Sequence, residues 1–167
     1  MNSQQTTFGG ASSAIGIYVP AGEDRFKTPD HFGGGSRVAC KVSANDTSRE
    51  LYIFESITNG LENVPRHFHR DQDEWFYVIE GEFKFEVGNE KYTLTEGDSL
   101  LAPRGVPHVW SCVSNSGKLI IACQPAGSME TFFHEVSDLV ASQASNDQFT
   151  ACYATHGMQI VGPPLSR

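Results

Sequence analysis

The sequence predicts a small all-β fold, an antiparallel β-barrel or β-sandwich, and two observations support this class. Short apolar and β-branched segments recur through the middle of the chain, and Gly, Asn, Asp and Pro separate them. Hydrophobic residues make up 39% of the 167-residue chain, which is enough for one globular core. No internal repeat or linker divides the chain, so we expect one domain.

The strongest strand signal is the strict alternation in residues 82–87, where Phe83, Phe85 and Val87 share one face. Gly88-Asn89 follows as a two-residue hairpin signal, and residues 91–94 form the returning strand. Comparable runs between turn residues predict the other strands, which are residues 15–19, 37–42, 51–58, 75–80, 99–102, 108–114 and 118–124.

The character of the chain changes after Gly127. Residues 130–142 carry apolar side chains at helical spacing, and residues 147–155 fit a second short helix that Gly157 ends. We therefore expect three segments, which are a flexible N-terminal tail (1–13), a barrel (14–127) and a C-terminal helical extension packed on the barrel (128–167).

Composition excludes several functional classes. The formal net charge is −8 and only 12 Lys and Arg are spread along the chain, so we expect no nucleic-acid partner. No run is long enough to cross a membrane, and residues 1–13 do not resemble a secretory signal, so we expect a cytoplasmic protein without a membrane partner. The four cysteines are far apart and are expected to be reduced and mostly buried; they are Cys40, Cys112, Cys123 and Cys152.

The chemistry is concentrated in residues 65–74. His67 and His69 are separated by one residue, so on an extended chain both point to the same side with Cα atoms roughly 6.5 Å apart. The polar run 70–73 is typical of a turn that returns Glu74 at the start of the next strand, facing inward. A carboxylate inside an apolar barrel needs compensation, for which a cation is one candidate. The spacing itself does not establish that one ion joins these side chains.

The histidines outside this segment have different interpretations. His108 follows the Pro103-Arg104-Gly105 turn on a later strand and is a candidate fourth ligand. His31, His134 and His156 are isolated and are expected to be surface or hydrogen-bonded residues.

The spacing of these residues resembles the two-part cupin signature. In the first part, His67-x-His69 is followed by four residues, Glu74, six residues and Gly81. The opening glycine of that part is displaced, because Gly60 lies one position early and Leu61 takes its place.

The second part of the signature also matches. Gly97 is followed by five residues, Pro103-x-Gly105, two residues and His108. Cys112 stands where the family has Asn; it lies about 13 Å along the strand from His108, so packing is its expected role.

The cupin resemblance implies a double-stranded β-helix, or jelly-roll, barrel around one divalent transition metal ion (Fe, Ni, Mn, Co, Cu or Zn). The ligands implied are His67, His69, Glu74 and His108. Quercetinase-like cupins further imply a dioxygenase acting on an enol or phenol, with Glu74 as ligand and catalytic base. The candidate substrate-pocket residues, for which packing in the barrel core is the alternative, are Phe76, Phe83, Phe85 and Trp110.

Two other functions stay open at this point. One is redox-neutral, metal-dependent isomerase, epimerase or lyase chemistry on a polar small molecule such as a sugar. The other is a non-catalytic cupin that binds a ligand or stores metal. By analogy with cupins that pair through their sheets, we also expect a homodimer with a small-molecule substrate.

Overall fold

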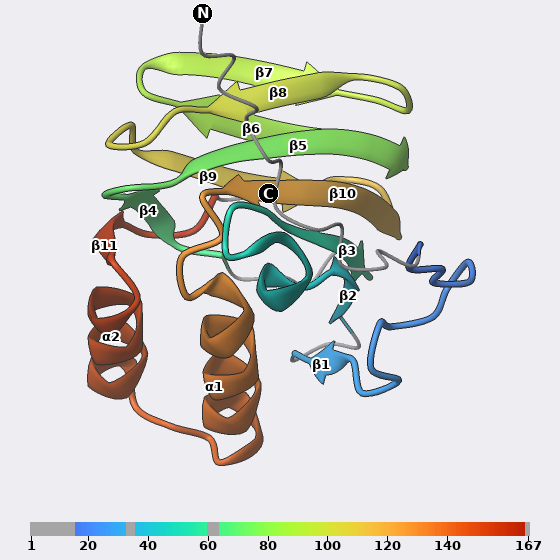
Figure 1. Cartoon of the computed structure of the whole chain (residues 1–167). Helices are drawn as coiled ribbons and strands as arrows, with labels where there is room; N and C mark the ends of the chain where they lie inside the picture. The colour runs from blue at the N-terminus through green and yellow to red at the C-terminus, as the bar shows by residue number, and fades with distance from the viewer. Residues whose placement is uncertain (1–15, 33–35, 60–63, 166–167) are drawn as a thin grey trace, which may run out of the picture.

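The computed structural model describes residues 16–32, 36–59 and 64–165 (Figure 1). Within these residues two antiparallel sheets face each other, so the predicted all-β jelly-roll fold is confirmed. One sheet has the order β1-β2-β3-β10-β5-β8 and the other has the order β11-β4-β9-β6-β7. The strands are β1 (Asp30–His31), β2 (Arg37–Val42), β3 (Tyr52–Thr58), β4 (Arg66–His69), β5 (Asp73–Glu80), β6 (Phe83–Val87), β7 (Glu90–Leu94), β8 (Ser99–Ala102), β9 (His108–Cys112), β10 (Gly117–Gln124) and β11 (Met158–Gly162).

The core lies between the two sheets and follows the predicted alternation. On β6, Phe83 and Phe85 are buried, whereas Lys84 between them is exposed. Phe76 and Val78 face them from β5 in the other sheet, and Phe76 meets the edge of the Phe85 ring at a centroid distance of 4.9 Å. These side chains fill one end of the barrel, which leaves the other end for the candidate site.

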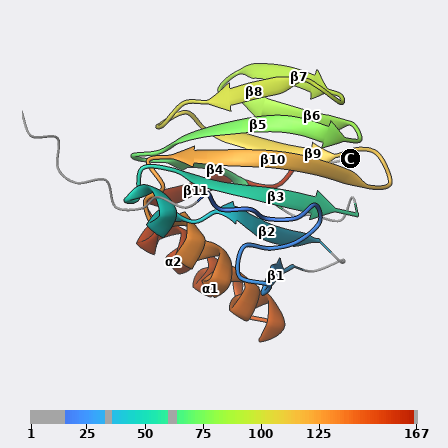
Figure 2. The same ribbon diagram turned by 45° about the vertical axis from the view of Figure 1, so that its right-hand side comes forward.

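The C-terminal helices α1 (Met129–Ala141) and α2 (Asn146–Thr155) lie side by side at one end of the barrel (Figures 1 and 2). Ser145 begins α2 with a capping box, in which the side chains of Ser145 and Gln148 bond each other's backbone N–H. Gly157 follows α2 at φ +78°, a conformation that favours glycine, and reverses the chain as the sequence predicts.

The structure departs from the predicted strands near both ends of the chain, and it also contains β1, which the sequence did not predict. Residues 16–19 form no strand, and the Tyr18 side chain is 86% exposed, because this short apolar run pairs with no other strand and Pro20 ends it. The sequence did not predict β11, which pairs with β4 and returns the chain end to the barrel. Residue 15, the tail 1–13 and residues 60–61 lie outside the described residues. Within the described chain, neither helix has the length and apolarity needed to span a membrane.

Candidate metal centre

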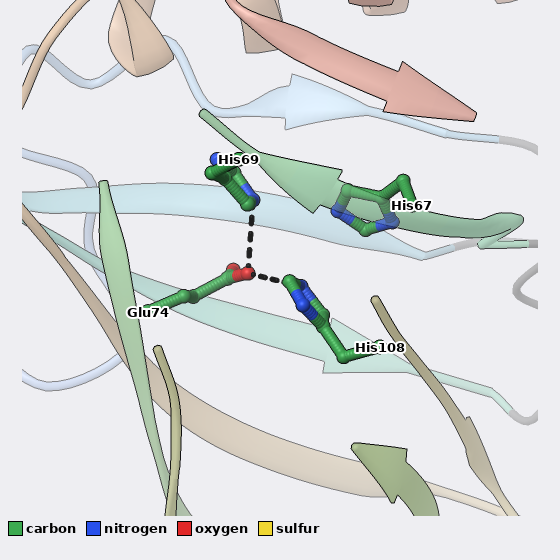
Figure 3. Close-up of side chains that lie close together, drawn as sticks. All are labelled: His67, His69, Glu74 and His108. Atoms are coloured by element: carbon green, nitrogen blue, oxygen red, sulfur yellow. Dashed lines mark hydrogen bonds and ion pairs between the residues drawn. The ribbon is translucent and has the colours of Figure 1, made fainter. Parts of the chain in front are cut away.

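Three strands bring four polar side chains to one point inside the barrel (Figure 3). His67 and His69 come from β4, Glu74 from the start of β5, and His108 from the start of β9. His67 lies opposite His108 in the ladder between β4 and β9. One nitrogen or oxygen atom of each side chain lies within 4.8 Å of those of the other three, and all four residues are buried. The structure thus brings together every residue that the sequence nominates as a ligand.

Local hydrogen bonds fix the loop that precedes His108. The backbone N–H of Gly105 donates to the carbonyl of His69 at 2.7 Å, which joins this loop to the end of β4. Arg104 contacts Asp73 with its guanidinium at 2.7 Å and with its backbone N–H at 2.9 Å. The loop is therefore fastened to both strands that carry the other three side chains.

Each histidine has an acceptor beside its Nδ1 atom. The acceptor is the Pro65 carbonyl for His67 at 2.8 Å and the Val106 carbonyl for His108 at 3.1 Å. A carbonyl only accepts, so both Nδ1 atoms carry the proton and both Nε2 atoms present a lone pair. Outer acceptors of this kind orient metal-binding histidines.

Gln72 performs this function for His69. Its Oε1 lies 3.3 Å from Nδ1 of His69, and its amide group donates to the carbonyls of Pro125 at 2.9 Å and Ala126 at 2.7 Å. These two donations fix the orientation of the amide, so Oε1 must face His69. The Nε2 lone pair of His69 therefore also faces the centre, and this atom is enclosed without a hydrogen-bond partner.

The groups at the centre lack a positive partner. Oε2 of Glu74 lies 3.0 Å from Nε2 of His108 and 3.1 Å from Nε2 of His69 (Figure 3). With protons on the Nδ1 atoms, these nitrogens present lone pairs to the carboxylate, and the arrangement is favourable only with a positive charge among them. A divalent cation supplies this charge, and three imidazoles with one carboxylate suit a first-row transition metal. The donor set therefore fits the ion that the sequence resemblance implies.

Burial and neighbouring groups shift the pKa values of His67 and Glu74. Burial, reinforced by neighbouring His108 and His69, lowers the pKa of His67 to about 3, so this imidazole is neutral at physiological pH. Burial alone raises the pKa of Glu74, but the close contacts of its carboxylate with His108 and His69 outweigh burial and hold that pKa below its usual value. A neutral imidazole and an ionised carboxylate are the forms that bind metal ions.

A cavity of about 630 Å³ opens beside the four side chains. His67, His69 and Glu74 form part of its wall. The rest is mainly apolar and includes Phe54 of β3 and Phe132 of α1. A volume of this size accommodates a small organic molecule.

The predicted pocket residues divide into two groups. Trp110 lines the cavity, as the sequence analysis suggested. Phe76, Phe83 and Phe85 do not, because they are at most 1% exposed and pack against one another in the closed end of the barrel. They serve as the core, although the ring of Phe76 still meets the edge of the His108 ring at a centroid distance of 6.2 Å.

Sequence reasoning missed the part of the cavity wall that the C-terminal helices form. Phe132 and Phe133 of α1 and Phe149 and Tyr153 of α2 line the cavity, and the ring of Tyr153 lies 5.5 Å from that of His67. The available signal was the spacing of i, i+3, i+4 and i+7 along each helix. In α1 these positions are apolar and show that the helix packs against something apolar, whereas in α2 two of them are Asn146 and Thr150. In neither helix does the spacing show that the helix faces a cavity.

A second group of potential ligands lies between α1 and α2, namely Glu135, Cys152 and His156. Here every group has a partner. His156 contacts Glu135 at 2.9 Å and Ser128 at 2.8 Å, and the Cys152 thiol donates to Glu135 at 3.7 Å. Burial raises the pKa of Cys152 to about 11, so the thiol stays protonated. This group is a hydrogen-bonded latch between the helices, consistent with the expectation that His156 is a hydrogen-bonded residue.

The four cysteines are free and buried, as the sequence predicts. Cys112 packs beside Ser114 at the end of β9 and is absent from the four-residue centre.

Comparison with known proteins places this fold and site in a family. Residues 54–123, which include all four candidate ligands, match the family model of the cupin domain. A solved RmlC-like cupin from Shewanella frigidimarina is 31% identical, with a TM-score of 0.51 over 59% of this chain and 84% of that one. The chain belongs to the cupin superfamily.

Further relatives are more distant. Quercetin 2,3-dioxygenase of Bacillus subtilis is 26% identical over 87 residues, which are 52% of this chain and 26% of that protein. An uncharacterized protein of Methanocaldococcus jannaschii is 27% identical over 74 residues, 44% of this chain and 56% of that protein. This chain thus spans about a quarter and just over half of the two curated relatives. KdgF from Halomonas sp. shares the fold, with a TM-score of 0.53 and 20% identity over 59% of this chain and 86% of that one.

Proposed function

We propose that this cupin is a metal-dependent dioxygenase that acts on an enol or phenol with an apolar body. The observation that carries the proposal is that three Nε2 lone pairs and one carboxylate converge beside a cavity walled mainly by aromatic and aliphatic side chains. The weak similarity to a quercetin dioxygenase supports the same class of reaction.

His67, His69, Glu74 and His108 would hold one divalent transition metal ion, which is Fe, Ni, Mn, Co, Cu or Zn. When bound, such an ion supplies Lewis acidity and, if it is redox-active, electron transfer to dioxygen. The protein holds the imidazoles in one orientation, with Nε2 toward the centre, through Pro65, Gln72 and Val106.

Glu74 is the base available to the substrate. Its carboxylate is ionised, lies in the wall of the cavity and is the charged acceptor of the centre. It would accept the proton of an enol or phenol that enters with its hydroxyl toward the centre. The apolar wall meanwhile excludes water from the deprotonated substrate.

The composition of the cavity favours this chemistry over redox-neutral conversion of a sugar. A sugar needs many hydrogen-bonding partners, whereas Phe32, Phe54, Phe132, Phe133 and Phe149 form much of the wall. An aromatic ring in the substrate gains favourable contacts with such a surface.

The first experiment measures the metal content of the purified protein by elemental analysis. The expected result is close to one equivalent per chain in the native protein and a large loss in His69→Ala. His134→Ala is the matched control, because His134 is 54% exposed and bonds Asp30 on the surface. Equal metal content in all three proteins would contradict the four-residue site.

The second experiment measures oxygen uptake by protein loaded with each candidate metal, over flavonols, diketones and catechols. We expect uptake with at least one redox-active metal and none with His69→Ala. Absence of uptake across the whole panel would refute the dioxygenase, and turnover under strictly anaerobic conditions would indicate redox-neutral chemistry instead. Tight binding without turnover would identify a binding protein.

We also propose that the protein is a homodimer. Trp75, Ile79 and Leu101 are exposed on the outer face of β5 and β8, and Trp75 lies directly opposite Leu101. Adjacent exposed apolar side chains of this kind favour burial against a second copy. A single monomer mass in sedimentation at micromolar concentration would refute the dimer.

A further inference from the structure

One face of α2 forms part of the cavity wall. Asn146, Phe149, Thr150 and Tyr153 all line the cavity, and their spacing of i, i+3, i+4 and i+7 places them on the same side of the helix. Tyr153 lies seven residues after Asn146, which is about 10 Å along the helix axis. Tyr153 is the member of this face that packs against a residue of the candidate metal centre.

The ring of Tyr153 is fixed from two sides. Its centroid lies 5.5 Å from that of His67 and 4.9 Å from that of Phe132, and each pair meets edge to face at 81°. Edge-to-face contacts hold an aromatic ring in one orientation. The position of the phenolic hydroxyl is therefore set by the protein before any ligand enters.

The hydroxyl itself has no protein partner among the described residues. The fully enclosed polar side-chain atoms that lack a hydrogen bond there are Oε1 of Glu55 and Nε2 of His69. The hydroxyl of Tyr153 is not one of those two atoms, so it is not fully enclosed, and the residue that carries it lines the cavity. A hydrogen-bond donor in a mainly apolar cavity is stabilised when a ligand or a water molecule accepts a hydrogen bond from it.

The hydroxyl is also a permanent donor. A phenol ordinarily has a pKa of about 10, so at neutral pH the hydroxyl carries its proton and can donate it in a hydrogen bond. The wall of the cavity therefore includes one carboxylate, that of Glu74, and one hydroxyl donor, that of Tyr153.

We infer that Tyr153 binds the substrate by donating a hydrogen bond to a second oxygen, adjacent to the oxygen that meets the metal centre. The inference rests on the proposed function. It narrows the substrate class to compounds with two neighbouring oxygens, such as catechols, enediols and α-hydroxyketones. A compound with only one oxygen leaves the Tyr153 hydroxyl without a partner inside the cavity. Such a compound should therefore bind more weakly than one with two neighbouring oxygens.

The test compares binding of 4-nitrocatechol and 4-nitrophenol by absorption titration at one fixed pH. The protein is loaded with Zn²⁺, which has no redox chemistry, so the spectra report binding alone. We expect Tyr153→Phe, which removes only the hydroxyl, to weaken 4-nitrocatechol binding about tenfold and to leave 4-nitrophenol binding within about twofold. Tyr92→Phe is the matched control, because Tyr92 lies on β7 and is 40% exposed.

The outcomes separate this inference from the function on which it rests. If Tyr153→Phe weakens neither compound, or both equally, the second-oxygen contact is refuted while the metal centre stands. If the variant loses zinc or unfolds at lower temperature, Tyr153 has a structural role and the inference is likewise refuted. If neither compound binds the native zinc-loaded protein, the proposed function itself fails and the inference fails with it.

Discussion

Replacing Gln72 with methionine tests the outer hydrogen bonds of the candidate metal centre. The substitution keeps the length of the side chain and removes its polar atoms. His69 then loses the acceptor that orients its ring, and the carbonyls of Pro125 and Ala126 lose the amide that donates to them. Gln72 is 5% exposed, so water cannot readily replace these bonds.

Gln72→Met should change two measurable quantities, the affinity for the metal and the free energy of unfolding. Loss of an outer partner of a metal-binding histidine typically weakens metal binding about 10- to 100-fold. The Pro125 carbonyl loses its donor and the Ala126 carbonyl loses one of two, since it keeps the backbone N–H of Met129. Together these losses cost about 3 kcal/mol in the free energy of unfolding. For a chain of 167 residues, that cost lowers the melting temperature by about 9 °C.

Competition with a chelator measures the metal affinity, and thermal unfolding of the metal-free protein measures stability independently of the metal. Gln159→Met is the matched control, because Gln159 is an exposed residue of β11. Metal affinity within twofold of native in Gln72→Met would refute the role of Gln72 in orienting His69.

Three further predictions concern residues around the same framework. Gly127→Ala should lower the melting temperature by several degrees, since Gly127 has φ +54° and an added Cβ would lie 2.7 Å from the Gln72 amide nitrogen; an unchanged melting temperature would show that the amide moves freely. Asp73→Asn should flatten the loss of stability between about pH 4 and pH 2, because hydrogen bonds from Arg104 lower the Asp73 pKa to about 2 and this contribution is present above pH 4 and lost below; denaturant titrations across that range measure it. His156→Ala should lower the melting temperature, because it removes the contacts with Glu135 and Ser128, and should leave the metal content at about one equivalent per chain. A native content of two equivalents that falls to one in this variant would show that the group between the helices binds metal.

The shared face of His67 and His69 could be predicted because it depends on a local rule, whereas the convergence of Glu74 and His108 on the same point was implied by the cupin resemblance. Two residues apart on a strand, His67 and His69 must share a face, and the structure brings Glu74 and His108 to the same point. The alternation of residues 83–87 likewise predicted which side chains face the core. The face of a residue on a strand needs only the period of the strand, whereas the meeting of residues from three strands needs the fold.

Depth along the barrel could not be predicted in the same way. Phe85 and Trp110 are cross-strand neighbours and both face inward, yet Trp110 reaches the cavity and Phe85 packs in the closed end. Alternation determines the face of a residue and carries no information about its position along the barrel axis. That position depends on strand pairing between distant segments, as does the return of β11 to β4.

The two groups of potential ligands show why proximity of donors is a weaker criterion than their hydrogen bonds. Both groups bring histidine and carboxylate atoms within 4.8 Å of one another. Between the helices, both nitrogens of His156 have partners, so that group is stable as it stands. In the barrel, outer acceptors hold the Nδ1 protons, and Nε2 of His69 is enclosed without a hydrogen bond. A buried carboxylate beside lone pairs requires a positive charge, and that unmet requirement distinguishes the candidate metal centre from the latch.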